Sequence, residues 1–138
     1  MANGIDLILA DHRKVDELFA TFATTGDGTI IGQVIDALSA HDDAEHAALY
    51  PLVGHVLGDT DMIERSGRAH SAVKKQIDHI KALEGAPLTE AFDVLRQLVE
   101  EHVADEEENI LPALAEQATA QQLEGLGARI LQAKQRGG

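Results

Sequence analysis

Residues 41–53, HDDAEHAALYPLV, place a histidine and a glutamate where helical spacing requires core side chains. Residues 102–114, HVADEEENILPAL, repeat the pattern. The His-x-x-x-Glu spacing puts the imidazole and the carboxylate of each pair on one helix face, one turn apart. A proline follows each pair, so each helix should kink or end near Pro51 and Pro112. The chain must therefore bury two copies of a polar pair inside a helical fold.

Apolar stripes at helical spacing extend outward from these two segments over the whole chain, and strand-like alternation is absent. Breaks at residues 24–28, 58–60 and 84–87, with a weaker one near 117–119, divide it into four long segments and a short fifth. This pattern predicts an all-α, antiparallel up-down four-helix bundle with a short C-terminal fifth helix. We expect one domain over residues 1–138, with the bundle at about 5–116 and the last helix, a cover for the bundle, at about 119–134.

Local start signals support these boundaries. Residues 61–64, DMIE, and 119–122, TAQQ, are interpreted as capping boxes, and Thr89 is a candidate cap for the fourth helix.

Composition excludes several classes of function. The 138 residues contain 24 acidic and 11 basic side chains, 3% aromatics and no cysteine. The charge of −13 argues against nucleic acid and anionic membranes as partners, and the lack of cysteine excludes thiolate metal sites. No segment is apolar enough to span a membrane, and the N-terminal residues lack a signal-peptide pattern, so we expect a cytoplasmic protein.

Potential metal ligands interrupt all four long stripes: His12, His41 with Glu45, His70, and His102 with Glu106. The first two histidines stand 14 and 15 residues from the break at Gly26, and the other two both stand 16 residues from Ala86. In an antiparallel hairpin, residues equidistant from the loop lie at the same height. All four helices should therefore project ligands into one layer of the bundle interior.

Two carboxylates in a core cost several kcal/mol unless a positive charge compensates them. Imidazole and carboxylate ligands suit iron, manganese or zinc, and six ligands suit two metal ions that share carboxylates. The alternative is a plain helical scaffold with solvated histidines. His55 and His79 lie off the stripes and should be solvated, as should the acidic residues 100–101 and 107–108.

The chain resembles the hemerythrin-like HHE cation-binding family over residues 5–115. The resemblance rests on the two segments above, on LADHRKVDELF around His12 and on RAHSAVKKQI around His70. The amino-acid composition of the chain is also similar to that of actinobacterial members of the family. The resemblance implies a non-haem di-iron site with an oxo or hydroxo bridge. The implied ligands are the six residues named above, with Glu45 and Glu106 bridging; manganese or zinc remains an alternative.

The third helix departs from the pattern of oxygen-carrying hemerythrins, which place a second histidine one turn from the first. Ser66 and Lys74 stand at those positions here. Tyr50 could supply the missing ligand as a phenolate, if Pro51 distorts the helix, or it could be ordinary packing. His46 is a further candidate, either as a ligand or as a hydrogen-bond partner of one.

A site short of one histidine favours reaction with small oxidants over reversible oxygen carriage. We expect binding of hydrogen peroxide, nitric oxide or oxygen, with catalase-like disproportionation as the enzymatic form. The alternative is a non-enzymatic module for oxygen or iron binding, sensing or storage. Whether the protein is an enzyme, and which protein partners it has, stay open at this point.

Overall fold

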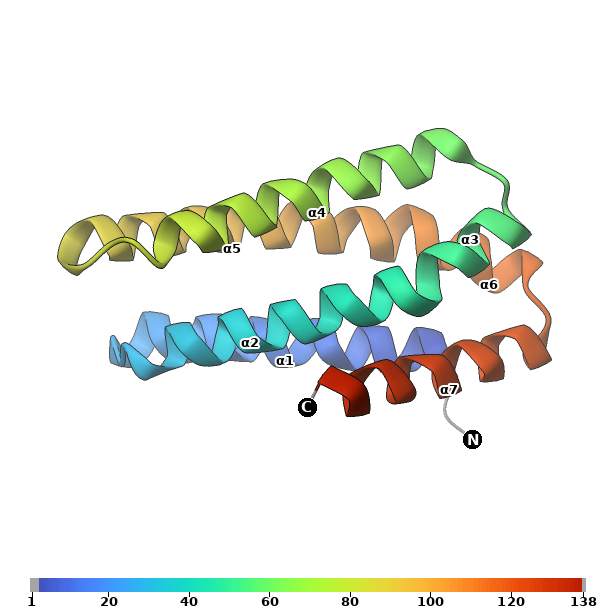
Figure 1. Ribbon diagram of the computed structural model, residues 1–138, viewed down its shortest axis with the longest axis horizontal. Helices are drawn as coiled ribbons and strands as arrows, with labels where there is room; N and C mark the ends of the chain where they lie inside the picture. Colours follow the sequence, from blue (N-terminus) through green and yellow to red (C-terminus); the bar gives the residue numbers. More distant parts are fainter. Residues whose placement is uncertain (1–2, 138) are drawn as a thin grey trace.

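The computed structural model describes residues 3–137 and is helical almost throughout, with no strand in that range (Figure 1). The helical elements are α1 (Gly4–Thr25), α2 (Thr29–Ala44), η1 (Glu45–Leu49), α3 (Tyr50–Val56), α4 (Thr60–Ile80), α5 (Gly85–Asp105), η2 (Glu106–Ile110), α6 (Leu111–Gln117) and α7 (Ala120–Gly137).

These elements form five rods, because α2, η1 and α3 are continuous, as are α5, η2 and α6. Rods α1, α2–α3, α4 and α5–α6 run up and down as a four-helix bundle, and α7 lies along α1 and α2 (Figure 1). The predicted fold class is confirmed. The C-terminal helix runs from Ala120 to Gly137, slightly beyond its expected end.

Three connections contain a glycine with a left-handed φ, at Gly26, Gly58 and Gly85. Gly26 adopts a left-handed φ of 66° and its N–H donates to the Phe22 carbonyl, which closes the end of α1. Gly58 has a φ of 62° between α3 and α4. Side chains rarely tolerate this conformation, so glycine allows short reversals that keep neighbouring rods antiparallel.

The expected disturbance at each proline takes the form of one π turn. The N–H of Tyr50 donates to the Glu45 carbonyl, and the N–H of Leu111 donates to that of Glu106. Proline has no N–H and its ring crowds the carbonyl four residues earlier, which weakens α-helical bonding at that point. The widened turns, η1 and η2, begin at the two buried glutamates and are a helix feature often found at functional sites.

The cap predictions have mixed outcomes. The box at Thr119 is confirmed, because its N–H donates to Gln122 Oε1 (2.9 Å) and its Oγ1 accepts from the Gln122 N–H (3.0 Å). The box at residues 61–64 is wrong: Asp59 caps α4 by accepting from the Met62 N–H at 3.0 Å. Thr89 lies inside α5, which begins at Gly85, and does not cap it.

The core has two apolar clusters with a polar layer between them. One cluster contains Val15, Phe19, Ile77, Ile80, Phe92 and Leu95 among others. The other is built from the opposite ends of the rods together with α7, and includes Ile8, Leu49, Leu52, Ile110, Leu114 and Leu126. The buried charged and polar residues lie in the layer that separates them. Within the described residues, no helix is long and apolar enough to cross a membrane.

The cap of α4 gives a first prediction. Replacement Asp59→Ala removes the hydrogen bond to the Met62 N–H and should lower the free energy of unfolding by about 1 kcal/mol. Asp61→Ala, which changes only an acidic side chain in the first turn, should have a smaller effect. Urea denaturation of the two variants measures the difference. Equal losses would contradict the assignment of Asp59 as the cap.

Candidate metal centre

Six predicted ligands meet in the polar layer, and each rod of the bundle supplies at least one. They are His12 on α1, His41 on α2, Glu45 at the start of η1, His70 on α4, His102 on α5 and Glu106 at the start of η2. All six are buried, and the two glutamates are 1% and 0% exposed. The levels inferred from loop distances therefore correspond to the three-dimensional arrangement.

The histidines form two pairs, and each glutamate contacts both pairs. Glu45 presents Oε2 to His41 Nε2 at 3.2 Å and Oε1 to His70 Nε2 at 3.1 Å. Glu106 presents Oε1 to His12 Nε2 at 3.0 Å and Oε2 to His102 Nε2 at 3.2 Å.

Two groups of possible ligands result, both of which contain the two glutamates. In the first group they join His12 and His41, and in the second they join His70 and His102. One ligand atom from each member lies within 4.8 Å of the others in its group. Each carboxylate could thus bridge two cations.

Several buried atoms of this layer have no hydrogen-bond partner among the described residues. They include His41 Nε2, both oxygens of Glu45, and His102 Nε2. Buried polar atoms without a hydrogen-bond partner are costly. Here imidazole nitrogens and carboxylate oxygens, which both offer lone pairs to a metal ion, lie close to one another. Metal ions would satisfy them, so the donor set fits a pair of bound cations.

Without metal, protons supply the positive charge of this layer. Burial opposes protonation of His41, but the Glu45 and Asp11 carboxylates outweigh burial and raise the pKa of His41 to about 10. Burial likewise opposes protonation of His102, whereas the Glu106 and Glu45 carboxylates, which lie 3.2 and 3.8 Å from its Nε2, raise its pKa to about 9. Burial disfavours the Glu106 carboxylate, yet contacts with the imidazoles hold the pKa of Glu106 well below its usual range. In the absence of metal, the two buried carboxylates are therefore balanced by protonated imidazoles of His41 and His102.

Comparison with known proteins identifies the family. The family model for the hemerythrin HHE cation binding domain matches residues 3–114. The chain belongs to the hemerythrin HHE cation-binding family. The resemblance inferred from the sequence motifs is confirmed, and the centre described above is the His/Glu cluster of an HHE domain that is able to hold metal.

Two known proteins are similar to this chain. A hemerythrin HHE cation binding domain-containing protein from Mycobacterium kansasii shares the fold, with a TM-score of 0.87 over 99% of this chain and 88% of that one, at 18% identity. A protein named DNA nickase from a Nostoc species is 33% identical over 127 residues. That match covers 86% of this chain but only 35% of the Nostoc protein, so the HHE domain corresponds to about a third of that relative.

Carboxylates hold three of the four histidines of the HHE site from outside. Nδ1 of His12 contacts Glu107 Oε2 at 2.7 Å, Nδ1 of His41 contacts Asp11 Oδ2 at 2.9 Å, and Nδ1 of His70 contacts Asp42. A proton on Nδ1 leaves the Nε2 lone pair directed at the centre, as a metal ligand requires. Burial and the neighbouring His102 lower the pKa of His70 to about 4, which favours its neutral form.

Sequence reasoning missed these outer carboxylates. Glu107 was expected on a solvated face, and although its side chain is 41% exposed it also bonds His12. The only signal in the sequence was position, because each of these carboxylates is adjacent to a proposed ligand. Asp11 precedes His12, Asp42 follows His41 and Glu107 follows Glu106. Asp11 also accepts a hydrogen bond from Lys134 on α7. Helix α7 therefore contacts the carboxylate that holds the His41 imidazole.

Tyr50 reaches the second ligand group. Its hydroxyl lies 2.7 Å from His70 Nε2 and donates to Glu106 Oε2 at 2.8 Å. On a regular α-helix Tyr50 would point away, but the π turn places it directly below Glu45. Burial and the two glutamates raise the pKa of Tyr50 above its ordinary value. Ser66, one turn before His70, is fully buried on α4.

The other histidines lie outside the six-residue cluster. His46 is 54% exposed in its side chain and contacts Asp42 at 3.4 Å, so its nearest polar partner is an outer carboxylate. With Asp42 and His70 it forms a third group of possible ligands, which shares the buried His70 with the six-residue cluster. His55 and His79 are exposed, as their positions off the apolar stripes indicated.

A small cavity of about 40 Å³ adjoins the four histidines. Apolar side chains supply most of its remaining wall: Val15, Leu38, Val73, Val99 and Val103. A space of this size holds one or two water-sized molecules. The cavity therefore restricts what can reach the histidine face of the centre.

The shared position of Glu106 gives a second prediction. Because its two oxygens contact opposite histidine pairs, Glu106→Gln should reduce the metal bound per chain by at least one ion. His79→Ala, at an exposed position on α4, is the matched control and should retain the full content. Elemental analysis after expression in iron-supplemented medium measures both. Equal metal in the two variants would show that Glu106 is not a ligand.

Proposed function

We propose that this HHE domain holds two iron ions and reacts with small oxidants, with hydrogen peroxide as the first candidate and nitric oxide or oxygen as further ones. His12 and His41 would bind one ion, His70 and His102 the other, and Glu45 and Glu106 both. The observation that carries this proposal is that each glutamate turns one oxygen to each histidine pair. Six ligands from four rods exceed what one tetrahedral ion needs.

Tyr50 supports iron over zinc or manganese in this proposal. A phenolate is a strong ligand for ferric iron, and this hydroxyl lies among residues of the second ligand group. The equivalent position after η2 is Leu111, which is buried in an apolar cluster and offers no ligand atom. The two ions would therefore have different surroundings, with a position for a small molecule on the side of His12 and His41.

The size of the adjoining cavity supports a small substrate. About 40 Å³ with mainly apolar walls suits peroxide, nitric oxide or oxygen and excludes larger organic molecules. Bound iron would supply the electron transfer by which two molecules of peroxide yield one of oxygen and two of water. The residues of the chain would exclude bulk water and orient the reactants against the histidine face.

The role of Tyr50 can be read from the visible spectrum. The iron-loaded protein should show a broad visible band from a phenolate bound to ferric iron, and Tyr50→Phe should lose that band while it retains its iron. The variant removes only the hydroxyl that contacts His70 and Glu106. Absorption spectra with iron content determined on the same samples provide the test. A band that persists in Tyr50→Phe would rule out the phenolate.

Peroxide consumption tests the proposed activity directly. Addition of hydrogen peroxide to the iron-loaded protein should release oxygen, and Glu106→Gln should release at least about tenfold less per chain, because it lacks a shared ligand. Stopped-flow spectroscopy with an oxygen electrode follows the reaction, and a parallel experiment follows nitric oxide decay.

Other outcomes would point away from catalysis. If neither oxidant is consumed and the iron spectrum does not change, the catalytic proposal is wrong. Reversible oxygen binding would then identify a non-enzymatic oxygen-binding module. Less than about half an equivalent of iron per chain would instead favour a plain helical scaffold.

A further inference from the structure

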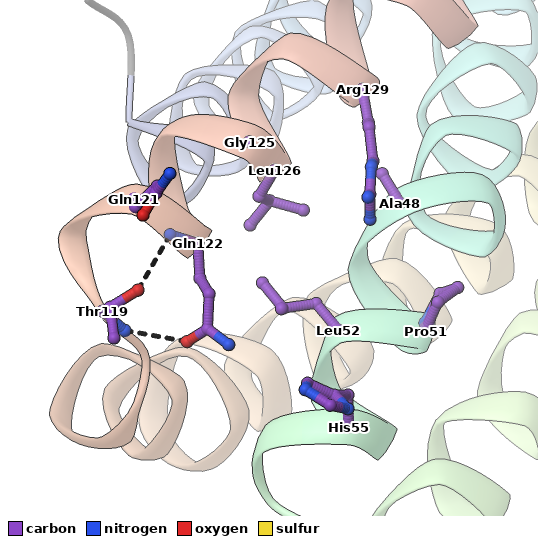
Figure 2. Close-up of a pocket in the computed structure, with 10 residues that line it drawn as sticks. All are labelled: Ala48, Pro51, Leu52, His55, Thr119, Gln121, Gln122, Gly125, Leu126 and Arg129. Atoms are coloured by element: carbon purple, nitrogen blue, oxygen red, sulfur yellow. Dashed lines mark hydrogen bonds between the residues drawn. The ribbon is translucent and has the colours of Figure 1, made fainter.

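A second cavity, far larger than the one beside the histidines, lies between α7 and the α2–α3 rod (Figure 2). Its volume is about 400 Å³, within the range of sites that hold small organic ligands. It is separate from the metal centre, since none of the six proposed ligands lines it. The proposed function does not use it.

The walls of this cavity divide into an apolar floor and a polar rim. Buried side chains of Ala48, Leu52 and Leu126 form the floor. Arg129 and His55 belong to the rim, and in Figure 2 the Arg129 side chain extends from α7 toward Ala48. A ligand that fits must therefore combine an apolar body with a polar end.

The charge of the rim is unusual for this protein. The chain has 24 acidic residues, yet none of the ten described residues that line the cavity is acidic. Arg129 is exposed at the rim, and no ion pair found among the described residues involves it, as is also true of several other basic residues of the chain. A guanidinium beside an apolar floor, without a protein carboxylate, is suited to bind a carboxylate from outside.

The capping box of α7 adds neutral donors to the same rim. Thr119 Oγ1 accepts from the Gln122 N–H, so its own hydroxyl hydrogen remains available. Gln122 uses Oε1 in the cap, which leaves its amide N–H groups free of that interaction. One guanidinium with neutral donors matches a singly charged carboxylate better than a phosphate dianion, which usually requires more than one cation.

We propose that this cavity binds a small amphipathic carboxylate, such as a medium-chain fatty acid. The carboxylate would pair with Arg129, and the alkyl chain would lie on Leu52 and Leu126. The site is independent of the iron proposal, because neither its residues nor its ligand belongs to the metal centre.

Sodium octanoate, titrated into the metal-loaded full chain in a calorimeter, tests the proposal. Binding should be saturable with one molecule per chain, and Arg129→Gln should weaken it at least about tenfold. Octan-1-ol, which has the same chain without the charge, should also bind at least about tenfold more weakly. Arg68→Gln, at an exposed arginine on α4, is the matched control and should bind as the parent does.

A second variant blocks the cavity without disturbing the core. A Cβ at Gly125 would meet no atom within 4 Å, so Gly125→Leu should place its side chain in the open cavity and abolish binding. Gly32→Leu on α2 is an equally unobstructed control and should leave binding unchanged. The proposal is overturned if octanoate shows no saturable binding at millimolar concentration. Equal affinity for octan-1-ol, or unchanged binding in Arg129→Gln or Gly125→Leu, would overturn it as well.

Discussion

Two carboxylates in the middle of the bundle impose the constraint on which the rest of this structure depends. Glu45 and Glu106 are almost completely buried, and a buried carboxylate without compensation costs several kcal/mol. Each of the four bundle rods contributes an imidazole to this layer, and apolar clusters enclose the layer from both sides. Because the compensating charge must come from protons or from metal ions, cation binding follows from the packing of the core itself.

The π turns convert this constraint into a shaped site. Each begins at a glutamate, precedes a proline and keeps the rod continuous. The same device occurs twice, but it places a tyrosine below Glu45 and a leucine below Glu106. A pseudo-symmetric scaffold thus carries an asymmetric cluster: the Tyr50 hydroxyl contacts His70 and Glu106, whereas Leu111 at the equivalent position offers no ligand atom.

The fold and the six converging residues could be predicted because both depend on periodicity. Apolar spacing defines the rods, and a polar residue on an apolar stripe is conspicuous. The contact of Tyr50 with the centre could be predicted only on the condition that Pro51 distorts the helix, since the π turn changes the direction of every later side chain. Asp11 and Asp42 were not found because acidic residues are abundant in this chain, and nothing in the sequence separates a hydrogen-bonded one from a solvated one. The cap at Asp59 was missed for the same reason, because Asp61 lies two residues away.

The fifth helix shows how far a prediction from hydrophobic spacing can extend. Its stripe of Leu123, Leu126 and Ile130 indicated a cover, and these residues do complete one apolar cluster. Lys134 adds a polar contact that no apolar stripe reveals: it pairs with Asp11, and Asp11 holds the imidazole of His41. Helix α7 therefore contacts both the apolar end of the bundle and the outer partner of a proposed ligand. A displacement of α7 would remove the charge that positions Asp11, so the docking of this helix and the orientation of His41 are linked.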